Sequence, residues 1–268
     1  MKWLKRAALV VLASIALMGI LAPQIAPRPY DAQSRESADA PPSSAFPMGA
    51  DEIGRDRFSR LLYGTRVSAL LAPAAACVSI VLALGISFVA VSGSRIVFFG
   101  FSGLTTICLS LPWIFLFIIL RAKLPLNTGP ALSVGLTFGL MGLAGWAWPA
   151  RVFAASIGEM KQSAWLMQAR SAGVREWRIA AVGMWPHLRA IALAQFRILV
   201  PAYVLSEASL GLLGLGVPEP LPSWGNLLRD LQHPDIVRSN PWVLAPLGLL
   251  CIAMVCLELL QSSREAAL

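Results

Sequence analysis

The side chains that most often perform chemistry are few in this chain and stand in no catalytic arrangement. His187 and His233 are its two histidines, and neither has a cysteine or another histidine at the spacing of a metal site. No nucleophile is paired with a base in the pattern of a hydrolase. The four cysteines fall in apolar stretches, where a small buried hydrophobe is the expected role: Cys77, Cys108, Cys251 and Cys256. The sequence therefore predicts no catalytic residue, no metal site and no enzyme activity.

Three glycines in one short segment could suggest a phosphate-binding loop: Gly211, Gly214 and Gly216. A P-loop needs a preceding strand and a following Gly-Lys-Ser or Gly-Lys-Thr, and both are missing here. Small residues that allow helices to pack closely explain these glycines better. We expect no cofactor in this chain, so any ATP hydrolysis must come from another polypeptide.

Arg197 is the single residue with the most conspicuous setting, because it stands in an apolar stretch eight positions beyond Arg189. Eight helical residues correspond to about 12 Å. An arginine inside a membrane is costly and usually faces a cavity or a partner. Arg197 is thus a candidate for a transport pathway that favours anionic groups, but it could equally snorkel toward the membrane surface.

The elements around these residues are membrane spans. Of the 268 residues, 57% are hydrophobic and 13% are charged, against about 25% charged in ordinary soluble domains. About 20 apolar residues suffice for a helix to cross a bilayer. Four uncharged runs meet that length, and two further spans are less clean. The clean runs are 67–94, 96–120, 124–150 and 239–257, and the less clean spans are 7–22 and 190–217.

The prediction is an all-α integral membrane protein with about six transmembrane helices. The first of these, within 1–26, follows Lys2, Lys5 and Arg6 and also resembles a secretory signal peptide. We favour a retained helix, because small-residue cleavage signals near Ala22 are poor.

The net charge of +8 does not indicate nucleic-acid binding, because basic residues in a membrane protein report its orientation. The basic N-terminus and the basic loop 151–189 favour a cytoplasmic location for both. Six alternating spans then place the tail 261–268 in the cytoplasm as well. The permease-like core covers 67–260, and 207–240 forms an external segment.

Residues 27–66 form a polar external segment between the first two spans. Its first part is rich in Pro and Ser and is expected to be irregular. Asp51 to Arg66 alternates apolar and charged residues with helical periodicity. This pattern predicts an amphipathic helix lying at the membrane interface before the second span.

The loop 151–189 is too long and too regular for a simple connection. Trp165, Ala169 and Ala172 have the spacing of one helical face, and Gly173 would end that helix in a left-handed cap. A second short helix around Trp177 should close before Pro186. Such a helix pair could dock in a groove of a soluble partner. The alternative is a loop that lies on the membrane surface.

These residues resemble the permeases of ABC importers, more specifically the dipeptide/oligopeptide/nickel branch. Three segments carry the resemblance, over roughly residues 48–250. The first is Gly49-x-Asp51-Glu52-x-Gly54-Arg55-Asp56-x-x-Ser59-Arg60-Leu61-Leu62-Tyr63-Gly64-x-Arg66-x-Ser68. The second is Ala169-Arg170-x-x-Gly173-x-x-x-x-Arg178-Ile179, with Pro186 beyond it. The third is Glu207-Ala208-Ser209-Leu210-x-x-Leu213-Gly214-Leu215-Gly216-Val217, followed by Pro222-Ser223-Trp224-Gly225-Asn226.

The chain departs from that family's pattern at several positions. The usual Glu-Ala-Ala triplet of the loop reads Met167-Gln168-Ala169, and Gly183 and His187 replace a histidine and an asparagine. The Arg and Asp that are usual in the third helix appear as Gly103 and Thr106. The C-terminal Gly-Asp-x-x-Arg-Asp motif is replaced around Gln261 to Arg264.

The resemblance implies a type I importer permease fold and assigns roles to the matched residues. Loop 151–189 would be the cytoplasmic loop that couples to ATPase subunits. Its coupling residues would be Ala169, Arg170, Gly173, Arg178, Ile179 and Pro186. Residues on the side of an external binding protein would be Glu207, Ser209, Gly214, Gly216, Pro222, Ser223, Trp224, Gly225 and Asn226.

The implied partners are a second homologous permease subunit, two ABC ATPase subunits that bind ATP and Mg, a periplasmic or lipid-anchored binding protein, and membrane lipid. The implied location is the bacterial inner membrane, with both termini in the cytoplasm. Peptides are the default substrate, followed by nickel or its chelates, with glycosides or opines also open. A membrane scaffold or regulator that has lost transport is the alternative function.

Overall fold

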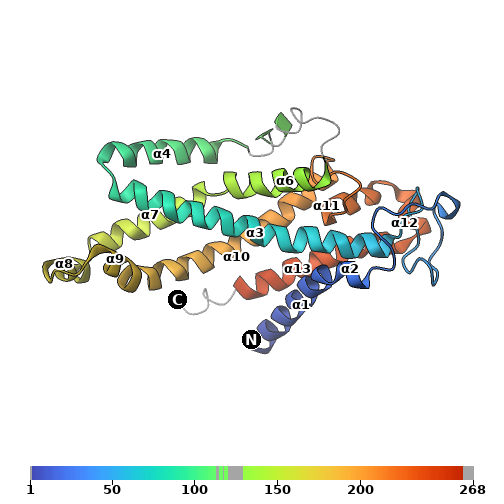
Figure 1. Cartoon of the computed structure of the whole chain (residues 1–268), viewed down its shortest axis with the longest axis horizontal. Coiled ribbons are helices and arrows are strands. Elements are labelled where there is room, and N and C mark those ends of the chain that lie inside the picture. Colours follow the sequence, from blue (N-terminus) through green and yellow to red (C-terminus); the bar gives the residue numbers. More distant parts are fainter. Residues whose placement is uncertain (1, 113–114, 117, 120–128, 262–268) are drawn as a thin grey trace. The chain divides into compact units, whose positions relative to one another are not determined.

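The structure is a computed structural model that describes residues 2–112, 115–116, 118–119 and 129–261 (Figure 1). Within these ranges the chain is α-helical and contains no strand, apart from one isolated bridge between Ala50 and Asp56. The longer helices are α1 (Lys2–Ile20), α3 (Arg57–Ser92), α4 (Arg95–Ser110), α6 (Pro130–Ala144), α7 (Ala147–Lys161), α10 (Trp185–Leu212) and α13 (Ala245–Gln261). The short helical elements are α2 (Ala22–Ile25), η1 (Arg35–Ser37), α8 (Ala164–Ser171), α9 (Glu176–Arg178), η2 (Ile179–Met184), α11 (Trp224–Leu227), η3 (Leu228–Gln232), α12 (Pro234–Ser239) and η4 (Pro241–Leu244).

Four helical stretches in the described part of the chain are long and apolar enough to cross a membrane. They are Trp3–Ile20, Arg57–Ser92, Glu176–Leu212 and Pro241–Gln261. The two remaining predicted spans coincide with the shorter helices α4 and α6, and each predicted span also includes residues outside the described ranges. The chain is an all-α integral membrane protein. The predicted tail beyond Gln261 also lies outside the described residues.

The chain divides into two compact units. Unit 1 comprises Met1–Pro73, Phe117–Gly139 and Val200–Leu268, and unit 2 comprises Ala74–Leu116 and Leu140–Leu199. In unit 1, α1 packs along α13 (Figure 1). Gly19 allows α1 to approach α3 closely, because a Cβ at Gly19 would lie 3.0 Å from the backbone of Arg66.

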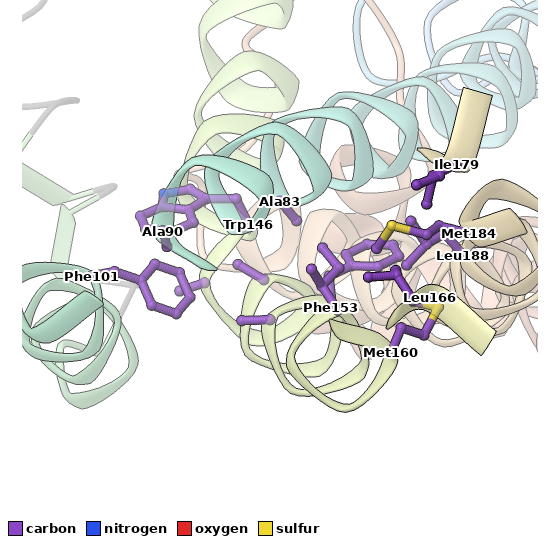
Figure 2. Packing of buried hydrophobic residues seen from close by; sticks show 14 residues of the cluster. Ala83, Ala90, Phe101, Trp146, Phe153, Met160, Leu166, Ile179, Met184 and Leu188 are labelled. Carbon is purple, nitrogen blue, oxygen red and sulfur yellow. The ribbon is translucent and has the colours of Figure 1, made fainter. Parts of the chain in front are cut away.

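Unit 2 is built around a buried apolar cluster that joins its helices to one another (Figure 2). Helix α7 contributes one face at helical spacing, which includes Phe153 and Ile157, both fully buried. Leu166, Met184 and Leu188 close over that face from the segment that follows (Figure 2). Burial of each such side chain stabilises the fold by about 1.5–3 kcal/mol. The segment 164–188 is therefore part of the core of unit 2.

Three expectations about helix boundaries are wrong. Residues 51–56 form a turn, and the helical part of the predicted segment, 57–66, is the first part of α3, which runs without a break from Arg57 to Ser92. Three charged residues of this stretch, Arg55, Arg57 and Arg60, form ion pairs with the distant residues Glu219 and Asp230. The predicted loop 151–189 also begins inside a helix, since α7 continues to Lys161.

The second helix of that loop does not close before Pro186. Helix α9 continues through the π-helical segment Ile179–Met184 into α10, so that Pro186 lies inside one continuous helical stretch, Glu176–Leu212. Proline inside a helix cannot donate the usual hydrogen bond to the carbonyl four residues earlier, which here is that of Val182. A π-helical turn has wider i→i+5 bonding and can absorb the change of hydrogen-bond pattern before the proline.

Pro149 explains why the chain between α6 and α7 is not one continuous helix. It cannot donate a hydrogen bond to the carbonyl of Gly145, and the chain turns at Gly145 and Trp146.

Of the four cysteines expected to be buried, only Cys256 is; Cys108 is half-buried, and Cys77 and Cys251 lie on exposed faces of apolar helices. The described residues contain no cluster of His, Cys, Asp or Glu that could hold a metal ion.

Candidate functional site

The first candidate site is the hairpin 164–188 in unit 2, which consists of α8, a tight turn, α9, η2 and the first four residues of α10. Gly173 ends α8 with a φ of +71°, as its position in the sequence predicts. The Gly173 N–H donates to the carbonyl of Arg170 at 2.9 Å, and the Val174 N–H donates to that of Ala169 at 3.0 Å. These two bonds form a Schellman cap, and only glycine adopts its left-handed backbone without strain.

The two faces of the hairpin differ in exposure. Leu166 and Ile179 are 1% and 4% exposed and belong to the buried cluster. The opposite face carries large apolar side chains in the open. These are Met167, Val174, Trp177, Val182 and Trp185. A hairpin anchored by one face and apolar on the other is suited to dock against a further protein.

The predicted coupling residues lie at different places on this hairpin. Ile179 belongs to the buried cluster of unit 2, and Ala169 is partly buried against that cluster. Arg170 is exposed, and its Nε donates to Glu176 at 2.7 Å across the turn. Arg178 is exposed at the end of α9, and Pro186 is exposed in α10.

On α8 the buried side chain is that of Leu166, whereas Trp165 is 40% exposed. The Trp165 ring instead lies over Gly183, where a Cβ would come within 2.6 Å of Trp165 Cζ3. Gly183 therefore provides the space in which the indole ring packs. Sequence reasoning identified Gly183 only as a departure from the family pattern.

The second candidate site is a polar joint inside unit 1, formed by Thr65 and Ser68 of α3, Glu207 of α10, and Trp224 of α11. Ser68 Oγ donates to Glu207 Oε2 at 2.8 Å and accepts from the Trp224 backbone N–H at 2.9 Å. The Trp224 Nε1–H donates to Thr65 Oγ1 at 3.0 Å. Glu207 is fully buried. We call this network the Ser68–Glu207 joint.

Two further features hold the turn around Ser223–Asn226 in place beside the Ser68–Glu207 joint. Ser223 and Asn226 form a capping box, in which Asn226 Oδ1 accepts from the Ser223 N–H at 2.8 Å. Asn226 Nδ2 also donates to the Leu221 carbonyl at 2.8 Å. Gly211 of α10 allows a very close approach, because a Cβ there would lie 2.3 Å from the Gly225 carbonyl carbon.

A network of ion pairs extends from the joint and was not found by sequence reasoning. Arg60 Nη2 and Arg55 Nη1 reach the Glu219 carboxylate at 2.7 and 2.6 Å, and Arg55 also pairs with Asp51 at 2.6 Å. Arg57 pairs with Asp230. Burial alone would raise the pKa of Glu219, but the hydrogen bonds and charge of Arg60, together with Arg55, outweigh it and lower that pKa.

The structure thus brings the first and third sequence segments together and places most of the third inside the fold. Pro222, Ser223, Trp224, Gly225 and Asn226 are all buried, as are Glu207 and Gly216. Within this chain they build the Ser68–Glu207 joint and offer little open surface to a partner. Ser209 and Gly214 are exposed, and Gly214 has a φ of +74°.

Arg197, the predicted pathway residue, lies on α10 with an exposed side chain. Its role remains a prediction. Another arginine was missed as a candidate: Arg151 donates from Nη2 to Thr106 Oγ1 at 2.6 Å and from Nε to Thr105 Oγ1 at 3.0 Å. The only sequence signal was its position at the end of an uncharged run.

Long apolar helices with a hairpin that is anchored by one face and exposed on the other suit the membrane component of a transport system. Residues 79–262 match the family described as the binding-protein-dependent transport system inner membrane component. This match covers more than half of the chain, and the chain belongs to that family, which has the type I importer permease fold.

Three curated relatives are similar along nearly the whole chain. The oligopeptide transport system permease protein OppC of Escherichia coli is 30% identical, over 98% of this chain and 85% of the relative. OppC of Bacillus subtilis is 29% identical, over 92% of this chain and 78% of the relative. The dipeptide transport system permease protein DppC of Bacillus subtilis is 27% identical, over 99% and 81%.

Proposed function

We propose that this chain is the transmembrane permease subunit of an ATP-driven importer of peptides. The names of the relatives support peptides ahead of nickel or other small solutes. The observation that carries the proposal is the hairpin 164–188, with one face buried in the core of unit 2 and the other exposed and apolar. The chain itself makes or breaks no bond in this proposal.

The proposed assembly contains four further components. A second, homologous permease forms the translocation path together with this chain, and two ABC ATPase subunits hold ATP and Mg. A periplasmic or lipid-anchored binding protein delivers the substrate. Both termini and the hairpin lie in the cytoplasm, and the segment 207–240 faces outward. The basic residues around Lys2 and Arg6 support this orientation.

The mechanism follows from how the hairpin is held. An ATPase that closes on ATP would press on the exposed side chains, such as Trp177 and Val182, and displace the hairpin. Because Leu166 and Ile179 are packed against α7, the displacement passes to the helices without stretching the hairpin. Arg170 and Glu176 brace the turn at 2.7 Å. Helix movement between inward-facing and outward-facing states is the result.

Substitution at Gly173 tests the proposal. Gly173→Val places a β-branched residue at a φ of +71°, although no atom blocks the space for its Cβ. We expect the variant to assemble but to lose substrate-stimulated ATP hydrolysis and uptake in proteoliposomes. Gly173→Asn is the matched control, because asparagine tolerates the left-handed region, and should retain most activity.

Two outcomes would contradict the proposal. A chain purified from its native host without ATPase subunits or a sister permease would point to the scaffold alternative. Unchanged ATP hydrolysis and uptake in Gly173→Val would show that the hairpin does not couple the subunits.

A further inference from the structure

A groove between α4 and α7 in unit 2 has a volume of about 630 Å³ and is lined by two residues of opposite charge. Its walls include Val91, Phe98 and Phe101, which are apolar. Arg151 and Glu159 both line it, eight residues apart on α7. At 1.5 Å per residue, their positions are separated by about 12 Å along the helix axis.

Arg151 is oriented by two hydroxyl groups of α4. Thr105 Oγ1 and Thr106 Oγ1 each donate to the Ser102 carbonyl, at 3.0 and 2.8 Å, which leaves their lone pairs to accept from Arg151. A guanidinium has five N–H donors. Two are used here, so three N–H groups are left to bind an anion in the groove.

Neither charge is neutralised by an opposite charge among the residues that the structure describes. No ion pair of the described residues includes Arg151 or Glu159. Thr105 and Thr106 supply hydroxyls that orient the guanidinium but carry no negative charge. A ligand with a carboxylate at one end and an ammonium at the other would therefore complement the groove.

We propose that this groove is a peptide-binding subsite on the transport path, specific for zwitterionic peptides of about three to four residues. The C-terminal carboxylate binds Arg151, the N-terminal ammonium lies toward Glu159, and apolar side chains pack on Phe98 and Phe101. An extended peptide spans at most about 3.3–3.6 Å per residue, so three to four residues match the axial separation of Arg151 and Glu159 on α7. The volume also lies within the usual range for small-ligand sites. This inference rests on the proposed peptide-import function.

The test uses the complete importer in proteoliposomes, with its binding protein at saturating concentration and trialanine as the probe. Arg151→Gln and Glu159→Gln should each lower trialanine uptake about tenfold or more, as expected for loss of one charge-assisted hydrogen bond. Arg95→Gln is the matched control. Arg95 carries the same charge at the start of α4, is exposed, and does not line the groove.

Two further variants act on the geometry without removing Arg151. Thr106→Asp places a carboxylate next to the guanidinium and should block the site, whereas Thr106→Ser keeps the hydroxyl and should preserve uptake.

The double exchange Arg151→Glu with Glu159→Arg reverses the polarity of the groove. Arg151→Glu alone and Glu159→Arg alone should each lose uptake. The double variant should recover part of that uptake, because the peptide can bind in the opposite direction.

The results separate failure of this inference from failure of the proposed function. Wild-type uptake of trialanine with unchanged uptake in Arg151→Gln and Thr106→Asp would overturn the subsite and leave peptide import intact. Absence of trialanine uptake by the wild-type importer would overturn both. A loss in Arg151→Gln that depends only on the anionic lipid content of the vesicles would assign the groove to a lipid phosphate and also overturn the subsite.

Discussion

Ser68 Oγ lies between the backbone N–H of Trp224 and the carboxylate of Glu207, at 2.9 and 2.8 Å. One hydroxyl thus connects three elements, α3, α10 and α11. All three groups are buried, so water cannot replace a lost partner. The Ser68–Glu207 joint is therefore a structural requirement of unit 1, and it accounts for the sequence pattern around both residues.

Ser68→Ala tests this requirement. The change leaves a buried N–H and a carboxylate oxygen without this partner, which typically costs about 1–3 kcal/mol. We expect a lower apparent melting temperature in detergent, followed by tryptophan fluorescence. Ser209→Ala is the control, because Ser209 is exposed and its hydroxyl donates to the Leu205 carbonyl of its own helix. Equal melting temperatures for Ser68→Ala and the wild type would contradict the argument.

Gly211→Ala should damage the same region through packing. The added Cβ would lie 2.3 Å from the Gly225 carbonyl carbon, and backbone cannot move aside as a flexible side chain can. Overpacking of this kind costs about 1–3 kcal/mol or more. Gly248→Ala in α13 provides the control, because nothing lies within 4 Å of its Cβ position. We expect folded protein to fall in the first variant only, as measured by size-exclusion chromatography.

The contact between Gly183 and Trp165 leads to a prediction about coupling. Gly183→Ala forces the indole ring to move, because its Cβ would lie 2.6 Å from Trp165 Cζ3. We expect uptake per ATP hydrolysed to fall while the chain still assembles. Adding Trp165→Leu should restore part of the coupling by making room. Equal effects of Gly183→Ala in the presence and absence of Trp165 would show that this contact is irrelevant.

Glu219 gives the region a defined dependence on pH. Its lowered pKa means that the folded state favours the carboxylate, so its contribution to stability is complete above the ordinary pKa of 4.5 and disappears as pH falls through the lowered value. The melting temperature should decrease on acidification more in the wild type than in Glu219→Gln. Parallel decreases in both proteins would assign the acid sensitivity to other groups.

Local features were predictable from the sequence, and contacts between distant segments were not. The cap at Gly173 depends on neighbouring residues, so its position alone indicated it. Ser68 and Glu207 were recognised within separate motifs, but they are 139 positions apart. Nothing in the spacing of the residues shows that those two segments form one buried joint.

One error concerned periodicity that had another cause. The pattern from Asp51 to Arg66 indicated a helix at a membrane surface, but Arg55 and Arg60 form ion pairs with Glu219. Tertiary contacts thus decided between two structures that the local pattern fits equally well.

The π-helical segment Ile179–Met184 sets the direction in which the hairpin points. A π-helical turn holds about one residue more than an α-helical turn, and one residue corresponds to a rotation of about 100° in an α-helix. Deletion of a single residue there would rotate α9 about the axis of α10 and turn Ile179 away from the core. The number of residues in this one turn therefore determines the direction in which the exposed apolar face of the hairpin points. The side chains on that face do not affect this direction.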